Sequence, residues 1–408
     1  MNILYFASTA FYARPNPSFH LMTAMIEDLI KYGHQVYFVG VKSINLQKHI
    51  PDTFINNPNF HYGLATCASV PKKAFVKRYL RGISLAFKQG RVMKSMIDNC
   101  DVVFLQSTPT ILYNAIVARH YAKNKPIIMN IQDMFPGSSI ASGVMPRRWM
   151  QKIFFFLQKI AYKKVDVVVG ISEDMRDKLM EQDVPFEKTH VILNWFDDNT
   201  VHEVPRSQNR FVKKYDMSED KFYVQYAGTL GYVFDYKIVL KVAELLKPYK
   251  DIEIQIIGMG SQKDVFEKEA KDNDLTNLHF MPLEPQEMVS DVYSACDVCY
   301  IPLKHGVIGN SVPSKAGLLM ACKRAIVTSV DKDCKYANDI NSNKLGFACA
   351  DDDPKSVADA LIYLYNNRKE CSEMGIRGFE YGYVKYSRTE NMRLFNELFN
   401  SFSKQSNN

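Results

Sequence analysis

The chain has 408 residues, which is too long for one ordinary hydrophobic core, so two domains are expected. Its 47% hydrophobic content excludes an intrinsically disordered protein, and no run of about 18 apolar residues predicts a membrane span. The formal net charge is +7, but no zinc-finger, recognition-helix or RNA-binding pattern accompanies it, so a nucleic-acid partner is not expected.

The start of the chain predicts an α/β domain. Residues 1–8 form an apolar run with no basic segment ahead of it, which indicates a buried strand rather than a signal peptide. Residues 9–19 contain two prolines and are expected to form an irregular loop. A helix over residues 18–32 and a second strand over residues 33–40 should follow.

Two later segments, residues 71–97 and 146–164, combine basic and apolar residues and contain no acid. Each predicts a helix with an apolar side and a basic side. Such helices suit an anionic membrane surface, where each nearby cation contributes on the order of 1 kcal/mol. The alternative is two helices that pack on the core and expose a basic face to water.

The remainder of the first domain leads to a candidate catalytic residue. Strands are expected over residues 101–106, 125–131, 165–170 and 190–194. Asp133 follows the second of these strands, and ligands of open parallel sheets bind beyond the carboxyl ends of strands. An aspartate in this place is also a common turn or helix-capping residue. The polar composition of residues 197–210 then indicates a domain boundary.

A second series of strands and helices begins near residue 222. Strands are expected there and over residues 251–258 and 278–283, with a helix over residues 236–246. Glycines at such strand ends let the backbone approach a ligand closely. The residues at the three strand ends are Gly228, Thr229, Gly231, Gly258, Met259, Pro282 and Leu283.

A polar loop then connects a strand at residues 297–302 to a helix at residues 315–321. A loop that enters a helix N-terminus presents unpaired N–H donors and the positive end of the helix dipole, which suits an anion. Lys315 adds a mobile charge of the kind that binds phosphate. We therefore predict a diphosphate pocket, with an ordinary α/β connection as the alternative.

The cysteines and one aspartate pair indicate no metal site. Eight cysteines are scattered through the chain, and only Cys296 and Cys299 have C-x-x-C spacing, so buried free thiols in a reducing cytoplasm are favoured. Asp331 and Asp333 are interpreted as a surface turn. The last helices are expected over residues 355–366 and 386–402.

The run from Val312 to Val327 resembles the donor-site segment of family 4 nucleotide-sugar glycosyltransferases. It is most similar to the bacterial surface-polysaccharide branch that transfers N-acetylfucosamine (L-fucosamine) sugars. The matching residues are Val312, Pro313, Ser314, Lys315, Met320 and Ala321. The family carries two glutamates at positions that correspond here to Asn310 and Leu318, so the usual ribose contact is missing.

Further residues are assigned by the same resemblance, which covers nearly the whole chain. It implies donor binding by the three strand ends given above, by Lys237 and by residues 309–315, and acceptor binding by Arg14, Asn16 and His20. The individual donor residues of the last segment are Gly309, Asn310, Ser311, Val312, Pro313, Ser314 and Lys315. The catalytic residues would be Asp133 and Lys315, with no metal ion and no cofactor besides the UDP-sugar substrate.

The two series and the resemblance together imply a GT-B fold, which has two doubly wound, Rossmann-like domains facing a cleft. We expect an acceptor domain at residues 1–197, a donor domain at 198–385 and a terminal helix at 386–408 that crosses back to the first domain. The implied reaction is retaining transfer of a sugar, such as N-acetylfucosamine, from a UDP-sugar to a polyprenyl-diphosphate-linked acceptor. It would serve O-antigen or capsule synthesis on the inner face of the plasma membrane, where the enzyme would be peripheral.

Three alternatives stay open. A UDP-sugar 2-epimerase would share the GT-B layout but would need clustered catalytic acids and histidines, which the sequence does not show. A catalytically silent subunit would account for Asn310 and Leu318. A basic membrane-surface adaptor would bind anionic vesicles but no nucleotide.

Overall fold

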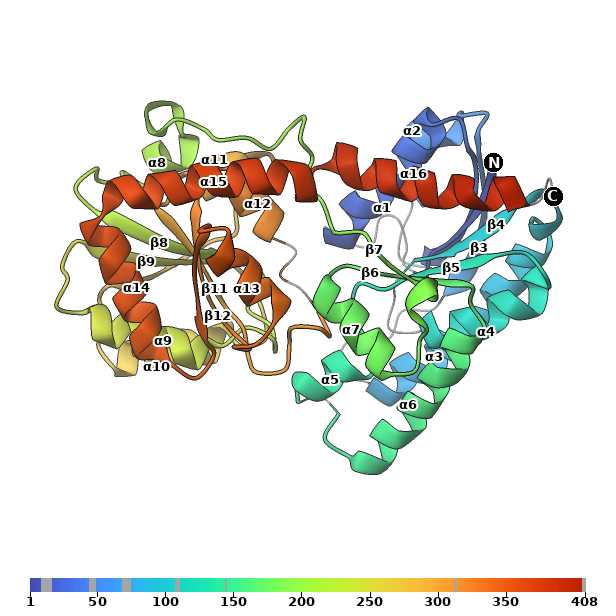
Figure 1. Cartoon of the computed structure of the whole chain (residues 1–408), viewed down its shortest axis with the longest axis horizontal. Helices are drawn as coiled ribbons and strands as arrows, with labels where there is room; N and C mark the ends of the chain where they lie inside the picture. Colours follow the sequence, from blue (N-terminus) through green and yellow to red (C-terminus); the bar gives the residue numbers. More distant parts are fainter. Residues whose placement is uncertain are drawn as a thin grey trace. The chain divides into compact units, whose positions relative to one another are not determined.

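The computed structural model describes residues 1–8, 17–43, 49–67, 75–106, 111–143, 145–311, 313 and 315–405. The chain divides into two compact units, each of which is described by itself (Figure 1). Unit 1 comprises Met1–Pro136, Pro146–Leu193 and Asn391–Asn408, and unit 2 comprises Gly137–Met145 and Asn194–Glu390.

Unit 1 is built on a parallel sheet that has seven strands within the described residues, in the order β3-β2-β1-β4-β5-β6-β7. The order reverses between β1 and β4, which is the topological switch point of a doubly wound sheet. The strands are β1 Asn2–Phe6, β2 Gln35–Ser43, β3 Phe60–Cys67, β4 Val102–Leu105, β5 Ile127–Asn130, β6 Val167–Gly170 and β7 Thr189–Val191.

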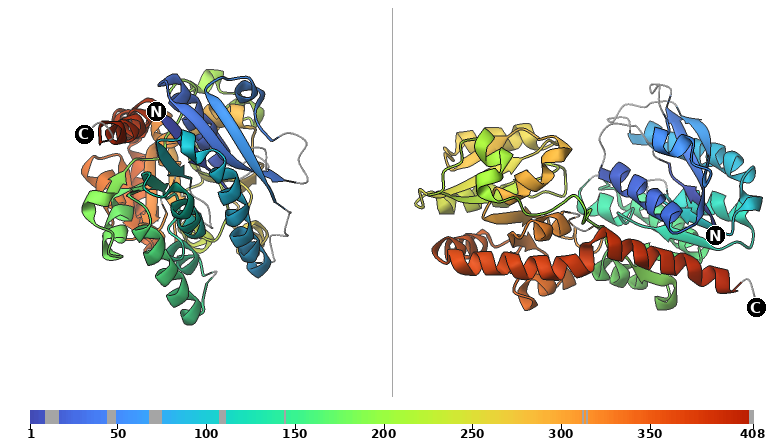
Figure 2. Two further views of the ribbon diagram at one scale, coloured as in Figure 1. Left: turned by 90° about the vertical axis from the view of Figure 1, so that its right-hand side faces the viewer. Right: turned by 90° about the horizontal axis from the view of Figure 1, so that it is seen from above.

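Helices and short 3-10 turns connect these strands. Ser172 caps one helix as expected, because its hydroxyl accepts a hydrogen bond from the Met175 N–H at 3.0 Å. Helix α4 packs against both α3 and α6, on one side of unit 1 (Figures 1 and 2). The helical elements are α1 Pro17–Lys31, α2 Asp52–Ile55, α3 Phe75–Lys94, η1 Ile97–Asn99, α4 Ile111–Ala122, α6 Arg148–Lys163, α7 Glu173–Glu181 and η2 Phe186–Lys188.

The C-terminal helix α16, Arg388–Gln405, packs on unit 1 from residue 391 onward. Phe399 is fully buried, and its ring centroid lies 5.7 Å from that of Phe104 on β4. The side chain of Asn396 hydrogen-bonds the His34 ring at 2.8 Å, just ahead of β2. Burial lowers the pKa of His34, so this imidazole is favoured in its neutral form. These contacts give His34 a structural role.

Unit 2 is built on a parallel sheet of six strands within the described residues, in the order β10-β9-β8-β11-β12-β13. Its switch point lies between β8 and β11. Alternate residues of β8 enter two different hydrophobic clusters, so both faces of this sheet are covered. The strands are β8 Phe222–Ala227, β9 Ile252–Ile257, β10 Leu278–Met281, β11 Val298–Pro302, β12 Ala325–Val330 and β13 Gly346–Ala350.

The helices of unit 2 cover the two faces of this sheet. Helix α15 packs closely on α12, where its glycines leave room for the α12 side chains. A Cβ on Gly382 would lie 2.6 Å from the Cβ of Met320. The helical elements are α5 Gly137–Ala141, η3 Arg206–Gln208, α8 Arg210–Lys214, α9 Tyr236–Leu246, α10 Lys263–Asp272, η4 Gln286–Met288, α11 Val289–Ser294, α12 Ala316–Ala321, α13 Lys335–Ser342, α14 Pro354–Asn366 and α15 Arg368–Tyr386.

This architecture confirms the expected fold class of two Rossmann-like parallel-sheet domains. The sequence had given no prediction for the edge strands β3 and β13 or for α15. The strand expected over residues 190–194 is wrong at its end, because β7 stops at Val191. None of the described helices is long and apolar enough to cross a membrane.

Candidate functional site

The predicted donor residues of unit 2 lie at the carboxyl ends of neighbouring strands. Ala227, the last residue of β8, is in register with Ile257 of β9, and Ile257 is in register with Met281 of β10. The segments that follow these three strands therefore start side by side at one edge of the sheet. The segment after β11 starts at the same edge, across the switch point from β8. Ligands of doubly wound sheets bind at this place.

Lys315 reaches across the switch point to the end of β8. Its Nζ donates a hydrogen bond to the carbonyl oxygen of Ala227 at 2.8 Å and lies 3.8 Å from the centroid of the Tyr226 ring. Burial raises the pKa of Tyr226, so the ring facing the ammonium stays uncharged. The backbone of Lys315 directly precedes α12, so the loop and helix together fix where its side chain begins.

The ammonium of Lys315 is held in an enclosed place, although the residue as a whole keeps some exposed surface. Burial lowers the pKa of Lys315 from its usual value to about 7. Within the described part of the chain, no carboxylate forms an ion pair with this lysine. A buried cation without an anionic partner is costly, and a bound anion would offset that cost.

Two glycines allow the close approach of the loops at this edge. A Cβ on Gly228 would lie 1.9 Å from the Nζ of Lys315, and a Cβ on Gly258 would lie 1.9 Å from the carbonyl oxygen of Gly228. Neither position can hold a larger residue without a shift of the lysine or of the backbone. Gly231 is different, because a Cβ there would meet only Thr229 Cγ2 at 3.4 Å.

Two backbone N–H groups of the loop after β11 form hydrogen bonds within the loop. The backbone N–H groups of Asn310 and Ser311 both donate to the carbonyl oxygen of Val307, at 3.0 and 2.9 Å. The expectation that these two N–H groups are available to a diphosphate is therefore wrong for the loop as observed. Gly309, with φ +84°, adopts the left-handed conformation that this turn requires.

Asn310, at the first of the two family glutamate positions, is packed rather than free. Its Nδ2 donates to the Gly306 carbonyl oxygen at 2.9 Å, and a Cβ on Gly137 would lie 2.0 Å from its Oδ1. Leu318, at the second position, is partly buried on α12 and packs with the apolar cluster of unit 2. Its side chain offers no hydrogen-bonding group to a ribose.

A cavity of about 470 Å³ lies beside this edge. It brings together the exposed Lys237, at the start of α9, with Lys241 and Lys304. Lys304 Nζ approaches the Gln262 side-chain oxygen at 3.4 Å, and Gln262 in turn donates to the carbonyl oxygen of Phe234 at 2.9 Å. Asp235, Asp351 and Asp352 line the same cavity, so it carries charges of both signs.

The other predicted donor residues differ in exposure. Thr229, Met259, Pro282 and Leu283 are exposed, whereas Pro313 is half-buried. The Thr229 carbonyl oxygen accepts a hydrogen bond from the Tyr226 hydroxyl at 2.9 Å. Val312 and Ser314 lie outside the described residues.

The predicted catalytic Asp133 and the acceptor residue His20 belong to unit 1. Asp133 is exposed and follows β5 at the carboxyl edge of the sheet, and His20 is exposed on α1. The structure therefore does not bring either residue together with Lys315 inside one unit. Arg14 and Asn16 lie outside the described residues.

Unit 1 carries a polar network at the carboxyl end of β1. Buried Gln89 donates to the carbonyl oxygen of Ala7 at 2.8 Å and accepts from the Ser8 hydroxyl at 2.9 Å. Asn114 donates to the same hydroxyl at 2.8 Å. These contacts fix polar side chains at the switch point of unit 1, where a second ligand can bind.

The basic helix α6 exposes large apolar side chains. It packs through Phe154, Gln158, Ala161 and Tyr162, whereas Trp149, Ile153 and Phe156 are 59%, 49% and 65% exposed. Trp149, Ile153 and Phe156 follow one another at intervals of four and three residues, so they lie along one side of the helix. Helix α3 likewise exposes Leu80 and Phe87. Helix α6 therefore packs on the core and exposes a basic face, as the alternative expected, and it exposes apolar side chains as well.

Sequence reasoning missed several residues of this region. Tyr226 was read only as part of a strand, and no sequence signal shows that its ring faces Lys315. Lys304 was overlooked although it closely follows β11. Asp331 and Asp351 each directly follow a strand, which is the signal that singled out Asp133.

The eight cysteines are free thiols, as expected, and all except the half-buried Cys349 are buried.

Two protein-family descriptions match successive parts of the chain. "Glycosyltransferase Family 4" matches residues 21–200 and "Glycosyl transferases group 1" matches residues 207–381. Probable glycosyltransferase WbjE of Pseudomonas aeruginosa is 26% identical over 293 residues, which is 70% of this chain and 72% of that protein. The putative colanic acid biosynthesis glycosyl transferase WcaI of Escherichia coli (strain K12) is 25% identical over 40% of this chain and 41% of its own.

Solved structures with a similar fold cover nearly the whole chain. Sucrose-phosphate synthase from Thermosynechococcus elongatus has a TM-score of 0.77 at 13% identity and covers 99% of both chains. Anabaena HepE in complex with UDP-glucose has a TM-score of 0.70 at 13% identity, covering 98% of this chain and 100% of its own. At these identities the likeness shows the fold alone.

Proposed function

We propose that the chain is a glycosyltransferase with a Family 4 part followed by a group 1 part, and that it transfers a sugar from a UDP-sugar during synthesis of a surface polysaccharide. One relative and one protein of similar fold support the proposal by name. WcaI is described as acting in colanic acid biosynthesis, and HepE was solved with UDP and with UDP-glucose.

The observation that carries the proposal is the enclosed ammonium of Lys315 at the switch point of unit 2. It lies against the Ala227 carbonyl oxygen at 2.8 Å and next to Gly228, where a side chain would collide with it. A donor diphosphate at this edge would supply the negative charge that the lysine lacks within its own unit. As the bond between the sugar and the phosphate breaks, charge develops on the departing diphosphate, and Lys315 would stabilise it.

We propose that transfer retains the configuration of the sugar and needs no cofactor. The bond from the acceptor oxygen to the anomeric carbon forms on the face from which the diphosphate leaves, and the departing phosphate takes the acceptor proton. Asp133 would then orient the acceptor rather than act as the base. By resemblance the sugar is an N-acetylated 6-deoxyhexosamine such as N-acetylfucosamine, and the acceptor is linked to polyprenyl diphosphate.

We further propose that unit 1 binds the acceptor at an anionic membrane surface, on the inner face of the plasma membrane. The exposed stripe of Trp149, Ile153 and Phe156 on α6 provides the apolar contact. Exposed Arg148, Lys152 and Lys163 on the same helix provide the positive charge. Aromatic side chains beside cations are the combination that interfacial helices use.

Calorimetry with UDP and a set of UDP-sugars tests the donor site. We expect Lys315→Ala to weaken UDP binding at least tenfold, or about 1.4 kcal/mol, because a charge-assisted phosphate contact is lost. Lys332→Ala is the matched control, since Lys332 is an exposed lysine of the same unit. Equal affinity of wild type and Lys315→Ala would remove this lysine from the donor site.

A catalytically silent GT-B subunit is the second candidate, because Asn310 and Leu318 replace the two family glutamates. Incubation of the full chain with UDP-sugars and a polyprenyl-diphosphate saccharide, followed by mass spectrometry, distinguishes the two. A product enlarged by one sugar supports the transferase, and its anomeric proton coupling reports retention. Tight UDP binding with no product would support the silent subunit.

A further inference from the structure

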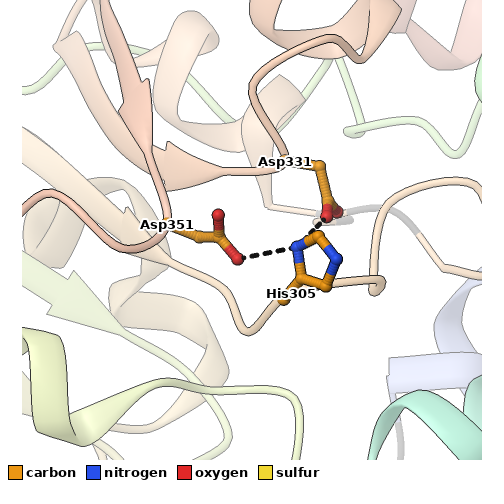
Figure 3. Close-up of side chains that lie close together, drawn as sticks. All are labelled: His305, Asp331 and Asp351. Carbon is orange, nitrogen blue, oxygen red and sulfur yellow. Dashed lines mark hydrogen bonds and ion pairs between the residues drawn. The ribbon is translucent and has the colours of Figure 1, made fainter.

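Three side chains that can bind a metal ion meet at the carboxyl edge of the unit 2 sheet. Asp331 directly follows β12, Asp351 directly follows β13, and His305 lies in the segment after β11. These three strands are neighbours, in the order β11-β12-β13. Their carboxyl ends therefore bring residues from distant parts of the sequence to one place (Figure 3).

The distances match those between two ligands of one cation. His305 Nδ1 lies 2.9 Å from Asp331 Oδ1 and 3.1 Å from Asp351 Oδ2. All three ligand atoms lie within 4.8 Å of one another. A cation about 2.1 Å from each of two ligands at a right angle would separate those ligands by about 3.0 Å. Small side-chain movements therefore suffice to admit an ion.

A second observation concerns the other oxygen of Asp331. Its Oδ2 is buried and has no hydrogen-bond partner among the described residues. The Oδ1 of the same carboxylate accepts a hydrogen bond from the backbone N–H of Gly306 at 2.8 Å, which fixes its orientation. Buried carboxylate oxygens are normally satisfied, so an orphaned one beside two potential ligands favours an ion there.

The charges of the cluster also favour a cation. Among the described residues, His305 is the group that forms an ion pair with Asp331 and with Asp351, and no lysine or arginine does. One imidazole that faces two carboxylates leaves an excess of negative charge even when it is protonated. The His305 side chain is 85% exposed, so an ion has a route from solvent and room for water ligands.

We propose that His305, Asp331 and Asp351 form a binding site for one divalent transition-metal cation. One imidazole nitrogen with two carboxylate oxygens is a ligand set that suits Zn²⁺ or Mn²⁺ better than Ca²⁺ or Mg²⁺, which prefer oxygen ligands alone. The ion would join the segment after β11 to the ends of β12 and β13. It would thereby hold the start of the loop that carries Asn310.

Metal titration of the full chain tests this site, after removal of any affinity tag and dialysis against a chelator. We expect one equivalent of Zn²⁺ to bind, measured by competition with a chromophoric indicator, and Mn²⁺ to bind at the same site, measured by electron paramagnetic resonance. His305→Gln and Asp351→Asn should each weaken binding at least tenfold. Metal should also raise the melting temperature of wild type but not of these two variants.

A matched control separates this site from other histidines of unit 2. His279 is exposed and contacts the carboxylate of Glu253 away from the cluster. His279→Gln should bind Zn²⁺ and Mn²⁺ like wild type. Failure of wild type to bind either ion at millimolar concentration would overturn the proposal, and so would equal binding by wild type, His305→Gln and Asp351→Asn. Circular dichroism establishes that the variants are folded, and substitution of His305 removes little packing because its side chain is 85% exposed.

Discussion

The Lys315 side chain determines how the donor site should respond to pH. Burial lowers its pKa to about 7, so the folded chain binds fewer protons than the unfolded chain between pH 7 and the ordinary lysine pKa. The free energy of unfolding should therefore rise with pH in this window. The affinity for a diphosphate should change with pH in the opposite direction, because the diphosphate binds the charged form of the lysine.

We predict that UDP affinity falls with increasing pH by up to about tenfold per pH unit above pH 7. Only the charged fraction of Lys315 attracts the diphosphate, and that fraction decreases in this range. Calorimetry between pH 7.5 and about 9.5, in buffers of different ionisation enthalpy, should report proton uptake on binding. Lys315→Ala should abolish both effects. A wild-type affinity that does not change with pH would contradict the assignment.

Gly258 and Gly231 differ in which atoms an added methyl group would contact. Their substitutions by alanine therefore form a matched pair. We predict that Gly258→Ala destabilises the chain by about 1–3 kcal/mol, because its Cβ would lie 1.9 Å from a backbone oxygen. Gly231→Ala should change the free energy of unfolding by less than about 1 kcal/mol, since its nearest neighbour is a methyl group at 3.4 Å. Chemical denaturation of the two variants measures the difference, and equal effects would contradict it.

Helix α6 is the element whose exposed surface most needs an explanation. Phe154 packs on Phe135 with ring centroids 5.0 Å apart, so one side of the helix is anchored to unit 1. Trp149 and Phe156 on another side remain exposed together with basic residues. A helix that served only the core would bury these aromatic rings first.

We predict that the chain co-sediments with vesicles that contain anionic lipid and much less with vesicles of neutral lipid alone. The double substitution Trp149→Ser and Phe156→Ser should reduce binding at least tenfold, because it removes the apolar contact and keeps the charge. Phe186→Ser is the control, since Phe186 is a comparably exposed aromatic residue of unit 1 outside α6. Equal binding of the double variant and wild type would exclude α6 as the docking surface.

At the scale of the whole molecule, helix α16, which lies at the C-terminal side of the sequence, packs on the sheet of unit 1, which begins with β1. The buried Phe395 and Phe399 of α16 contact Phe104 at the centre of the unit 1 sheet. The hydrogen bond between His34 and Asn396 joins the same helix to the segment before β2. Residues from both ends of the chain must therefore be present before unit 1 has its full core.

We predict that Phe399→Ala lowers the stability of unit 1 by about 3–5 kcal/mol, the usual cost of truncating a buried phenylalanine. Hydrogen exchange should show lost protection in β4 but not in β8 of unit 2. Glu397→Ala is the control on the same helix, because its ion pair with Arg393 is exposed and contributes about 0.5 kcal/mol or less. Equal loss of protection in both units would contradict this prediction.

Much of the fold could be predicted because it depends on short-range patterns. The apolar runs of β1, β4, β8 and β11 stand out, and so does the glycine at the end of β8. The edge strand β3 was missed because its burial pattern is irregular and its sequence contains a glycine, so it shows neither a continuous apolar run nor a regular alternation. Helix α15 was missed because three glycines weaken its helical pattern; two of them, Gly375 and Gly382, are explained only by the close approach of α12 and the residues that follow it.

The sequence by itself determined that two parallel sheets form and that Lys315 follows a polar loop, because hydrophobic periodicity and turn chemistry act over a few neighbouring residues. Only the tertiary structure decided that Lys315 meets a carbonyl oxygen 88 residues away and that His305, Asp331 and Asp351 share one place. Strand order in a sheet sets such long-range contacts, and no local pattern encodes the order in which strands pair.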